Sequence, residues 1–429
     1  MSTLTNADGD KPVAEAIIEM EKEYLVQNYS RYPVVLRRGK GCVLQDVNGK
    51  RYLDLISGIG VNALGHAHPR ILKLIKEQAG LLIHCSNLYY HEYQGPLAKK
   101  LSEITGLQRS FFCNSGAEAM EGGLKMIRAH GSSVSPEKHE IVSLENSFHG
   151  RTFGAVSVTG QKKFRDAFEP LLAGVKFVPA NDIAALEEAV GPNTAGLVLE
   201  GIQGEGGVRM VDGGYLRKAK ELAVKHNALL LFDEIQCGVG RTGKFFSYQL
   251  QDPAVLPDIV VAAKPLAGGL PLGVIVANEK AAATLAPGMH GSTFGGGALS
   301  CRVALEVLEI IEDLLPTIYQ VGGYFRICLE ELLRRFRYVK EIRAYGLMIG
   351  VELMIPGAPL VQEALDNGLL INCTQGNVLR FLPPYVITQP EVDKAMRILD
   401  KVFTKGREYF VESGLADEVI QGGHEPPVQ

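Results

Sequence analysis

The chain has 429 residues, of which 46% are hydrophobic and 21% charged, and its formal net charge is −4. This balance predicts a folded protein with a large core and excludes a wholly disordered chain. Because the sequence has neither a basic excess nor a polybasic run, nothing in it indicates nucleic acid or an anionic membrane as a partner.

The seven cysteines are scattered along the chain and form no C-x-x-C pair. An odd number of separated cysteines is typical of reduced thiols in a cytoplasmic protein. Residues 1–10 are polar and acidic and lack the pattern of a secretory signal peptide. Residues 422–429 are rich in Gly and Pro, which predicts a loose tail.

The first predicted element is a β-hairpin in residues 41–55, where apolar and polar residues alternate around an Asn48-Gly49 turn. Further along, short apolar runs alternate with helical patterns such as 182–190 and 215–226. The runs cover residues 140–144, 196–200, 228–232, 259–263 and 273–277. This alternation predicts a mainly parallel central sheet flanked by helices, with ligands at the carboxyl ends of its strands.

Residues 259–277 are nearly all apolar and could be mistaken for a membrane-spanning helix. They contain Lys264, two prolines and several glycines, which a spanning helix would tolerate poorly. We therefore predict two buried strands joined by a Gly/Pro loop.

After about residue 316 the pattern changes to helices with separate strands at 346–353, 368–372 and 377–381. Together with the N-terminal hairpin, these strands predict a smaller α+β domain that both ends of the chain form. The expected fold is α/β, with a large domain in residues 61–315 and a small discontinuous domain in residues 1–60 and 316–429.

An acid and a lysine each follow an apolar run in the middle of the chain. Asp233 follows the run 229–232, and Lys264 follows the run 259–263. Either residue alone is commonly just a solvated strand end. Together they suit pyridoxal 5′-phosphate (PLP), which needs a lysine to form a Schiff base and an acid to keep its pyridine nitrogen protonated.

A phosphate site is indicated at the start of a helical pattern after residue 114. Ser115 and Glu118 form a Ser-x-x-Glu capping box, and an isolated box of this kind is usually only a helix cap. The free amides and the dipole of such a terminus also suit a phosphate group. Gly116 and Ala117 leave space for it.

Two competing motifs are weaker. Residues 238–243 read Gly-Val-Gly-Arg-Thr-Gly, with Asp258 further on, which superficially matches a dinucleotide-binding fingerprint. That motif should open a crossover helix, but only a short stretch and two prolines follow it. A nicotinamide dehydrogenase, which would bind NADH, is therefore the lesser interpretation. His66 and His68 lack further ligands at zinc-like spacing, so no metal site is predicted.

With the lysine, the acid and the phosphate loop in place, the chain resembles the class III aminotransferases, a family of fold-type I PLP enzymes. The resemblance runs from about residue 29 to residue 384 and implies the architecture expected above. It is carried by Arg-Tyr-Pro-Val at 31–34, Asn-Ala-Leu-Gly-His at 62–66, Ser-Asn-Leu-Tyr-Tyr at 86–90, and by the segments 111–119, 146–152, 202–208, 233–236, 291–296 and 379–384.

The resemblance implies a role for each cofactor-binding position. Lys264 is expected to form the Schiff base and then to move the proton between the substrate and cofactor carbons. Asp233 should pair with the pyridine nitrogen, Gln236 with the ring oxygen, and Phe148 should stack on the ring. The phosphate ligands implied are Ser115, Gly116 and Ala117, together with Thr293 from the neighbouring subunit, which makes a homodimer necessary for a complete site.

The resemblance also implies two carboxylate-binding arginines. Arg380 should bind the α-carboxylate of glutamate or 2-oxoglutarate, and Glu205 should pair with Arg380 when an ω-amine substrate enters. Arg151 should bind a substrate carboxylate, with Tyr29 and Ser292 nearby. Arginine rather than lysine suits both positions because it binds carboxylates through two parallel hydrogen bonds.

The motifs at 86–90 and 146–151 are most similar to those of family members that act on N-acetylornithine. This similarity implies transfer of the terminal amino group to 2-oxoglutarate, giving a semialdehyde and glutamate, as a step of arginine biosynthesis. Ornithine, succinylornithine, 4-aminobutyrate and acylated lysine stay open as donors, because the chain departs from the family pattern at Gly201, Pro265, Gly297 and Ala298. A PLP aminomutase, a decarboxylase and an inactive binding protein with this fold are further alternatives.

Overall fold

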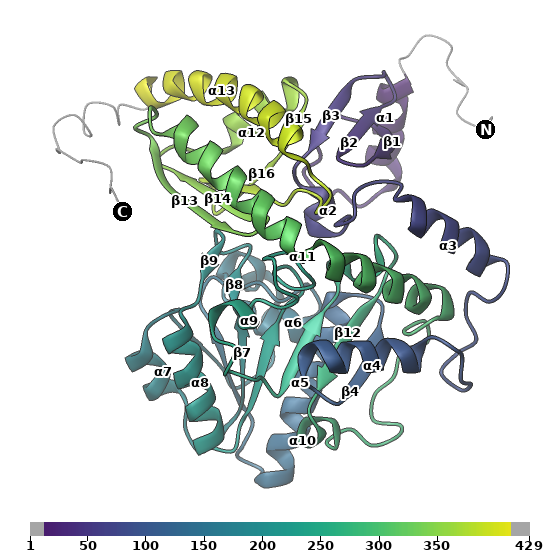
Figure 1. Ribbon diagram of the computed structural model, residues 1–429. Helices are drawn as coiled ribbons and strands as arrows, with labels where there is room; N and C mark the ends of the chain where they lie inside the picture. Colours follow the sequence, from purple (N-terminus) through teal and green to yellow (C-terminus); the bar gives the residue numbers. More distant parts are fainter. Residues whose placement is uncertain (1–12, 413–429) are drawn as a thin grey trace.

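The computed structural model describes residues 13–412, and a seven-stranded sheet forms its centre, with two smaller sheets above it in Figure 1. The residues without a signal-peptide pattern, 1–10, and the predicted loose tail, 422–429, lie outside the described part. In spatial order the central strands are β4 (Arg109–Cys113), β12 (Gly273–Ala277), β11 (Ile259–Ala262), β10 (Leu229–Asp233), β7 (Thr194–Glu200), β5 (Glu140–Leu144) and β6 (Val175–Val178).

The central sheet is mainly parallel, as predicted. β10 pairs in parallel with both β11 and β7, and β5 pairs in parallel with β7 and β6. β12 runs antiparallel to β11 and to β4. Residues 259–277 are thus two buried strands and a connecting loop, as expected. Within residues 13–412, no helix combines the length and apolar character that a membrane crossing requires.

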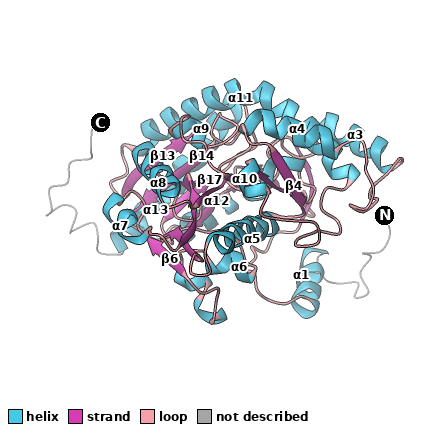
Figure 2. Cartoon of the chain, turned by 90° about the horizontal axis from the view of Figure 1, so that it is seen from below, coloured by secondary structure: helices cyan, strands magenta, loops and turns pink. Residues whose placement is uncertain are grey.

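The apolar runs form strands that are buried on both faces. Leu229 and Leu231 pack with residues of α5 (Gly116–Val134) on one face of the sheet. Leu230 and Phe232 pack on the other face with residues of α4 (Gln94–Thr105) and α8 (Gly213–Lys225). Figure 2 shows α5 and α6 on one side of the strands and α4 and α11 on the other. Successive strand residues point to opposite faces, so a continuous apolar run is what such a sheet requires.

Two adjacent glycines bring α5 close to the sheet. A Cβ atom on Gly122 would lie 2.3 Å from Ile275 Cδ1, and a Cβ atom on Gly123 would lie 2.5 Å from Leu231 Cδ1. A glycine inside a helix costs about 1 kcal/mol relative to alanine. Close packing offsets that cost here, and it fixes the amino end of α5 beside the carboxyl ends of the central strands.

The two termini meet in the smaller sheets. The predicted hairpin is present, because β2 and β3 pair antiparallel with Val43 opposite Leu53. β15 then adds to the hairpin in parallel, with Leu369 opposite Leu53. The strands of these sheets are β1 (Leu36–Lys40), β2 (Val43–Asp46), β3 (Arg51–Asp54) and β15 (Leu369–Leu370), and β13 (Val339–Tyr345), β14 (Met348–Leu353), β17 (Val378–Phe381) and β16 (Asn372–Thr374).

Helix α11 (Ala298–Leu333) continues through residues 315 and 316, where the sequence predicts a domain boundary. One continuous helix thus spans the predicted boundary, and the division into two domains stays a prediction. The remaining elements are α1 (Val13–Tyr24), α2 (Ser57–Gly60), α3 (Pro69–Ala79), α6 (Phe153–Ser157), η1 (Lys162–Phe164), η2 (Asp166–Phe168), α7 (Ile183–Ala189), β8 (Ile202–Gln203), β9 (Arg209–Met210), α9 (Tyr248–Gln251), η3 (Lys264–Ala267), α10 (Glu279–Ala282), α12 (Ala358–Asp366) and α13 (Gln389–Glu412).

The Gly-rich segment 238–243 opens no crossover helix and instead joins the central sheet to the C-terminal one. Arg241 in this segment is fully buried and lies over the ring of Tyr385, 4.5 Å from its centroid. Its Nη1 donates to Leu347 O at 3.1 Å and to Pro383 O at 2.6 Å. The segment therefore has a structural function, and the dinucleotide fingerprint lacks its required context.

Candidate active site

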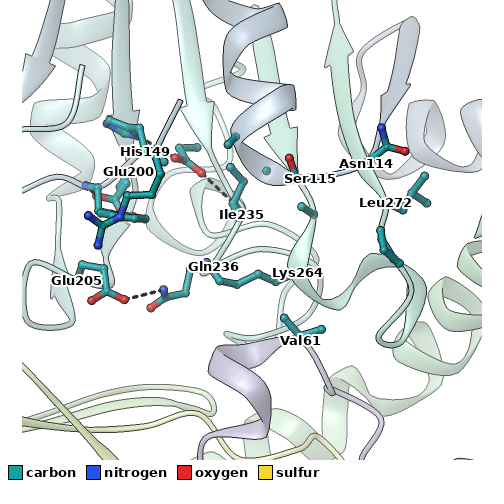
Figure 3. Close-up of a pocket in the computed structure, with 18 of the residues that line it drawn as sticks. Val61, Asn114, Ser115, His149, Glu200, Glu205, Ile235, Gln236, Lys264 and Leu272 are labelled. Atoms are coloured by element: carbon teal, nitrogen blue, oxygen red, sulfur yellow. Dashed lines mark hydrogen bonds and ion pairs between the residues drawn. The ribbon is translucent and has the colours of Figure 1, made fainter. Parts of the chain in front are cut away.

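A cavity of about 380 Å³ lies at the carboxyl ends of β7, β10 and β11, beside the amino end of α5. A volume of this size suits a cofactor or small substrate. Figure 3 shows Lys264 pointing into the same space as Gln236 and Glu205. The predicted residues that line this cavity are Ser115, Gly116, Ala117, Phe148, Arg151, Glu205, Asp233, Gln236 and Lys264.

Asp233 is the last residue of β10 and is almost fully buried. Its Oδ2 lies 2.7 Å from Nδ1 of His149, and its Oδ1 accepts a hydrogen bond from the backbone N–H of Ile235 at 3.0 Å. Both oxygens are therefore held in place, and the carboxylate keeps one orientation toward the cavity. A fixed carboxylate of this kind can hold a cationic ring nitrogen.

Lys264 begins η3, directly after β11, and its side chain lines the cavity. Burial lowers the pKa of Lys264, although the nearby carboxylates of Asp233 and Glu205 act in the opposite direction. A lowered pKa increases the fraction of neutral amine, which is the nucleophilic and basic form.

The amino end of α5 forms the opposite wall of the cavity. Ser115 is the N-cap residue, and its Oγ accepts from the N–H of Glu118 at 3.2 Å, while Oε2 of Glu118 accepts from the N–H of Asn114 at 2.8 Å. Ser115 thus caps the helix as predicted, while Glu118 reaches one residue further back, to Asn114, instead of closing the reciprocal bond of a capping box. A Cβ atom on Gly116 would lie 2.8 Å from the side chain of Ile235, so glycine keeps this corner open to an anion at the helix terminus.

These observations fit PLP. The helix terminus supplies amides for a phosphate, Asp233 supplies an anion for the ring nitrogen, and Lys264 supplies the amine. Phe148 lines the same cavity and offers an apolar face for a flat ring. Arg151 lies over the ring of Phe148, with its guanidinium carbon 5.5 Å from the centroid, so a cation stands at the mouth of the cavity.

Arg380 lies behind the cavity wall and is 1% exposed. Its Nη1 donates to Oε1 of Glu205 at 2.5 Å and to Oε1 of Gln236 at 2.9 Å, and Figure 3 marks the further contact between Gln236 and Glu205. Burial alone would raise the pKa of Glu205, but the Arg380 guanidinium outweighs burial and lowers that pKa. Glu205 therefore neutralises Arg380 in this arrangement.

Ser292, Thr293 and Tyr29 lie outside this cavity in the single chain. Ser292 and Thr293 line a second hollow of about 300 Å³, which shares Asn114 with the first one. Nδ2 of Asn114 donates to Oγ of Ser292 at 3.1 Å, so the two hollows are neighbours. Tyr29 is 69% exposed and lies beside Arg31.

His149 and Glu200 line the cavity and were not among the residues that the sequence singled out. His149 stands inside the segment 146–152, but its contact with Asp233 spans 84 residues, and no local pattern reveals such a contact. Glu200 carried a readable signal, because it ends an apolar run just as Asp233 does.

Comparisons with known proteins agree with this geometry. The model of the family "Aminotransferase class-III" matches residues 24–403. The chain is 48% identical to the acetylornithine aminotransferase of Methanocaldococcus jannaschii over 391 residues, which is 90% of this chain and 98% of that protein.

Among solved structures, the ornithine aminotransferase of Toxoplasma gondii ME49 superimposes with a TM-score of 0.88 at 35% identity, covering 93% of this chain and 97% of that one. A second Toxoplasma gondii structure of ornithine aminotransferase, with a TM-score of 0.87 and 35% identity, covers 92% and 95% of the two chains. It has PLP in partial occupancy at its active site.

Proposed function

The chain belongs to the class III aminotransferases, which use PLP, and we propose that it transfers the terminal amino group of N-acetylornithine to 2-oxoglutarate. The products are a semialdehyde and glutamate, and the reaction is a step of arginine biosynthesis. The observation that carries the proposal is the contact between Arg380 and Glu205 beside the Lys264 cavity, because this pair can accommodate both an ω-amine and a 2-oxo acid.

The cavity residues bind and orient the cofactor. Asp233, held by His149 and Ile235, would hold the pyridine nitrogen and keep it protonated. Gln236 would hold the ring oxygen, and Phe148 would cover the face of the ring. The amides of Ser115, Gly116 and Ala117 would hold the phosphate. When bound, PLP supplies the electron sink that makes a proton on the substrate carbon removable.

Lys264 moves that proton. Because burial lowers its pKa, the Nζ atom favours the neutral, basic form. It would be the group that takes up the proton of the substrate carbon and gives it back later in the reaction.

Two arginines bind the carboxylates of the two substrates. Arg151 binds the carboxylate of the amino donor, with Tyr29 and Ser292 nearby. Arg380 binds the α-carboxylate of 2-oxoglutarate or glutamate once Glu205 moves aside. While the donor occupies the site, Glu205 stays on Arg380 and cancels its charge, because the carbon that bears the ω-amine has no carboxylate to pair with that arginine.

Identity supports N-acetylornithine as the donor, since the acetylornithine aminotransferase relative is 48% identical over 90% of this chain. The solved structures do not separate the two donors, because an ornithine aminotransferase is 35% and an acetylornithine aminotransferase 33% identical to this chain. Ornithine, succinylornithine, 4-aminobutyrate and acylated lysine are the alternative donors. An aminomutase or a decarboxylase would have no use for a residue pair that admits an external 2-oxo acid. Retention of Arg380 and Glu205 therefore argues against both reactions.

The proposal includes a homodimer in which Thr293 reaches the phosphate of the other subunit. Thr293 is exposed, and its neighbourhood presents large apolar side chains to solvent, with Leu88 83% and Phe294 69% exposed. Exposed apolar surface of this kind is typical of an interface. The seven free cysteines favour a reducing compartment, so we place the reaction in the cytoplasm.

The first experiment is a visible absorption spectrum of the PLP-loaded protein, titrated with N-acetylornithine. We expect the band of lysine-bound PLP to disappear and 2-oxoglutarate to restore it. If the band does not change with N-acetylornithine but disappears with ornithine or 4-aminobutyrate, the donor is that second compound. A protein that binds no PLP would overturn the mechanism.

A further inference from the structure

Glu200 is a second buried carboxyl group at the bottom of the cavity. It ends β7, as Asp233 ends β10, and the two residues are paired directly across the parallel strands. Glu200 is 5% exposed and lines the same cavity as Lys264. Glu200 therefore adjoins the active site without being one of the residues expected to bind the cofactor or a substrate.

The carboxyl group of Glu200 connects two segments that the reaction needs. Its Oε2 accepts from the backbone N–H of Phe148 at 3.0 Å. Its Oε1 accepts from the backbone N–H of Gly204 at 3.4 Å, the residue immediately before Glu205. One side chain thus holds both the aromatic face of the cavity and the loop that places Glu205 on Arg380.

Glu200 and Asp233 place two carboxyl groups side by side at the bottom of the cavity. Burial, reinforced by the nearby carboxylate of Asp233, raises the pKa of Glu200 well above its ordinary value. A raised pKa means that the site disfavours a second negative charge beside Asp233. Asp233 receives hydrogen bonds from His149 and Ile235, so the two neighbouring strand ends do not have to carry two uncompensated charges.

We propose that Glu200 is a positioning residue that fixes Phe148 over the cofactor pocket and anchors the Glu205 loop, so that it sets the balance between the ω-amine and the 2-oxo acid half-reactions. The proposal rests on the aminotransferase function and on the proposed movement of Glu205 on and off Arg380. It does not depend on which ω-amine is the natural donor.

The test compares Glu200→Gln with the wild-type holoenzyme in separate half-reactions. The amide keeps the length of the side chain, but its NH₂ group faces a backbone N–H, so one of the two anchors is lost. A looser loop holds Glu205 less firmly on Arg380, which harms the ω-amine half-reaction more than the 2-oxoglutarate half-reaction. We expect the ratio of their single-turnover rate constants to fall about 10-fold, the usual effect of one lost buried hydrogen bond.

Glu234→Gln is the matched control. Glu234 is an equally buried acid at the same sheet edge, and burial raises its pKa to about 7. It accepts from the N–H and Oγ of Ser247 and from the N–H of Tyr248, so it supports neither Phe148 nor the Glu205 loop. The control should lower thermal stability and leave the ratio of the half-reactions unchanged.

Equal losses in both half-reactions, or the same ratio in both variants, would overturn the proposal. If Glu200→Gln does not fold, Glu200→Asp is measured in its place, since the shorter acid cannot reach both amides. If wild type ignores N-acetylornithine, the donor assignment fails, and the Glu200 test proceeds with any ω-amine that the wild-type enzyme accepts. The two failures are thereby distinguishable.

Discussion

Asp233 is 4% exposed and accepts hydrogen bonds at both carboxylate oxygens, whereas Tyr29 is 69% exposed and lies on the surface beside Arg31. The same contrast separates two groups of predicted site residues. The cavity floor, formed by Ser115, Glu200, Asp233 and Lys264, lies on strand ends and a helix terminus. The second group, Tyr29, Ser292 and Thr293, lies outside the cavity on exposed or half-buried segments and is called the rim below.

The difference separates site residues whose geometry is complete within one chain from residues for which we propose a contribution of a second chain. The floor residues come from elements that pack tightly within one chain, so their geometry is complete. Thr293 and Ser292 stand beside exposed apolar side chains such as Phe294, and in the proposed homodimer a second copy would cover that surface. Changes in the floor should therefore impair chemistry, and changes in the rim should impair binding in a way that depends on the dimer.

The largest effect is expected for Lys264→Ala. The change removes both the attachment point and the proton-transferring amine, so turnover should fall by roughly 10⁴-fold or more. PLP should still bind without covalent attachment, because Asp233 and the α5 terminus remain. Steady-state assays and the visible spectrum measure the two outcomes, and turnover within about 100-fold of wild type would contradict the assignment of Lys264.

Asp233→Asn removes the charge but keeps the shape of the floor. The amide oxygen can still accept the hydrogen bond from His149, so the fold should be preserved. Loss of the anion at the ring nitrogen should lower turnover by about 10²–10³-fold, as removal of one electrostatic partner does in other enzymes. A loss below about 10-fold, measured with PLP bound in full, would show that the charge of Asp233 is not needed.

Arg380→Lys separates the two substrates. Lysine cannot form the paired hydrogen bonds of a guanidinium with a carboxylate, so kcat/KM for 2-oxoglutarate should fall by about 10–100-fold. The ω-amine half-reaction should change less, because Glu205 masks this position while the donor is bound. Half-reaction kinetics with each substrate measure the difference, and equal losses for both would refute the dual role.

The pH dependence of cofactor attachment tests the burial of Lys264. Burial disfavours the ammonium form and lowers the pKa of Lys264, so the reactive neutral amine is present at lower pH than for a solvent-exposed lysine. The rate at which apoenzyme regains the visible band should rise with pH and level off below about pH 10.4, the ordinary lysine value. A midpoint at or above that value would show that the amine is solvated.

Much of the floor could be predicted from sequence because its signals are local. The central strands are buried on both faces and read as continuous apolar runs, and Asp233 and Lys264 stand at their ends. β4 and β6 were missed because they are only partly buried and carry Arg109 and Lys176. Glu200 carried the same signal as Asp233, since it too ends an apolar run.

Features that depend on close approach or on distant segments could not be predicted. Gly122 and Gly123 lie inside a helix, where glycine lowers helix stability, and their close contacts with the sheet explain their presence. Gly201, where the family pattern differs, lies so close to Ser247 that a Cβ atom would stand 2.3 Å from its Oγ. Tyr29 shows the opposite case, because its place next to a family motif does not fix the position of an exposed segment, and in the structure Tyr29 lies outside the cavity.

Thr293→Ala tests the rim with the smallest expected effect. Loss of one hydroxyl near the phosphate should weaken PLP binding by about 10-fold or less and leave kcat at saturating PLP nearly unchanged. Titration of apoenzyme with PLP measures the affinity. The decisive sample is a mixed dimer of one Thr293→Ala subunit and one Lys264→Ala subunit.

In that dimer, the intact Lys264 lies in the subunit with the altered residue 293, while its partner supplies a normal Thr293. If Thr293 acts across the interface, this site is complete, so it binds PLP with wild-type affinity and gives about half of the wild-type activity per dimer. If Thr293 serves its own subunit, the same site stays weakened. The mixed dimer thus decides whether Thr293 contributes to the PLP site of the partner subunit or to the site of its own chain.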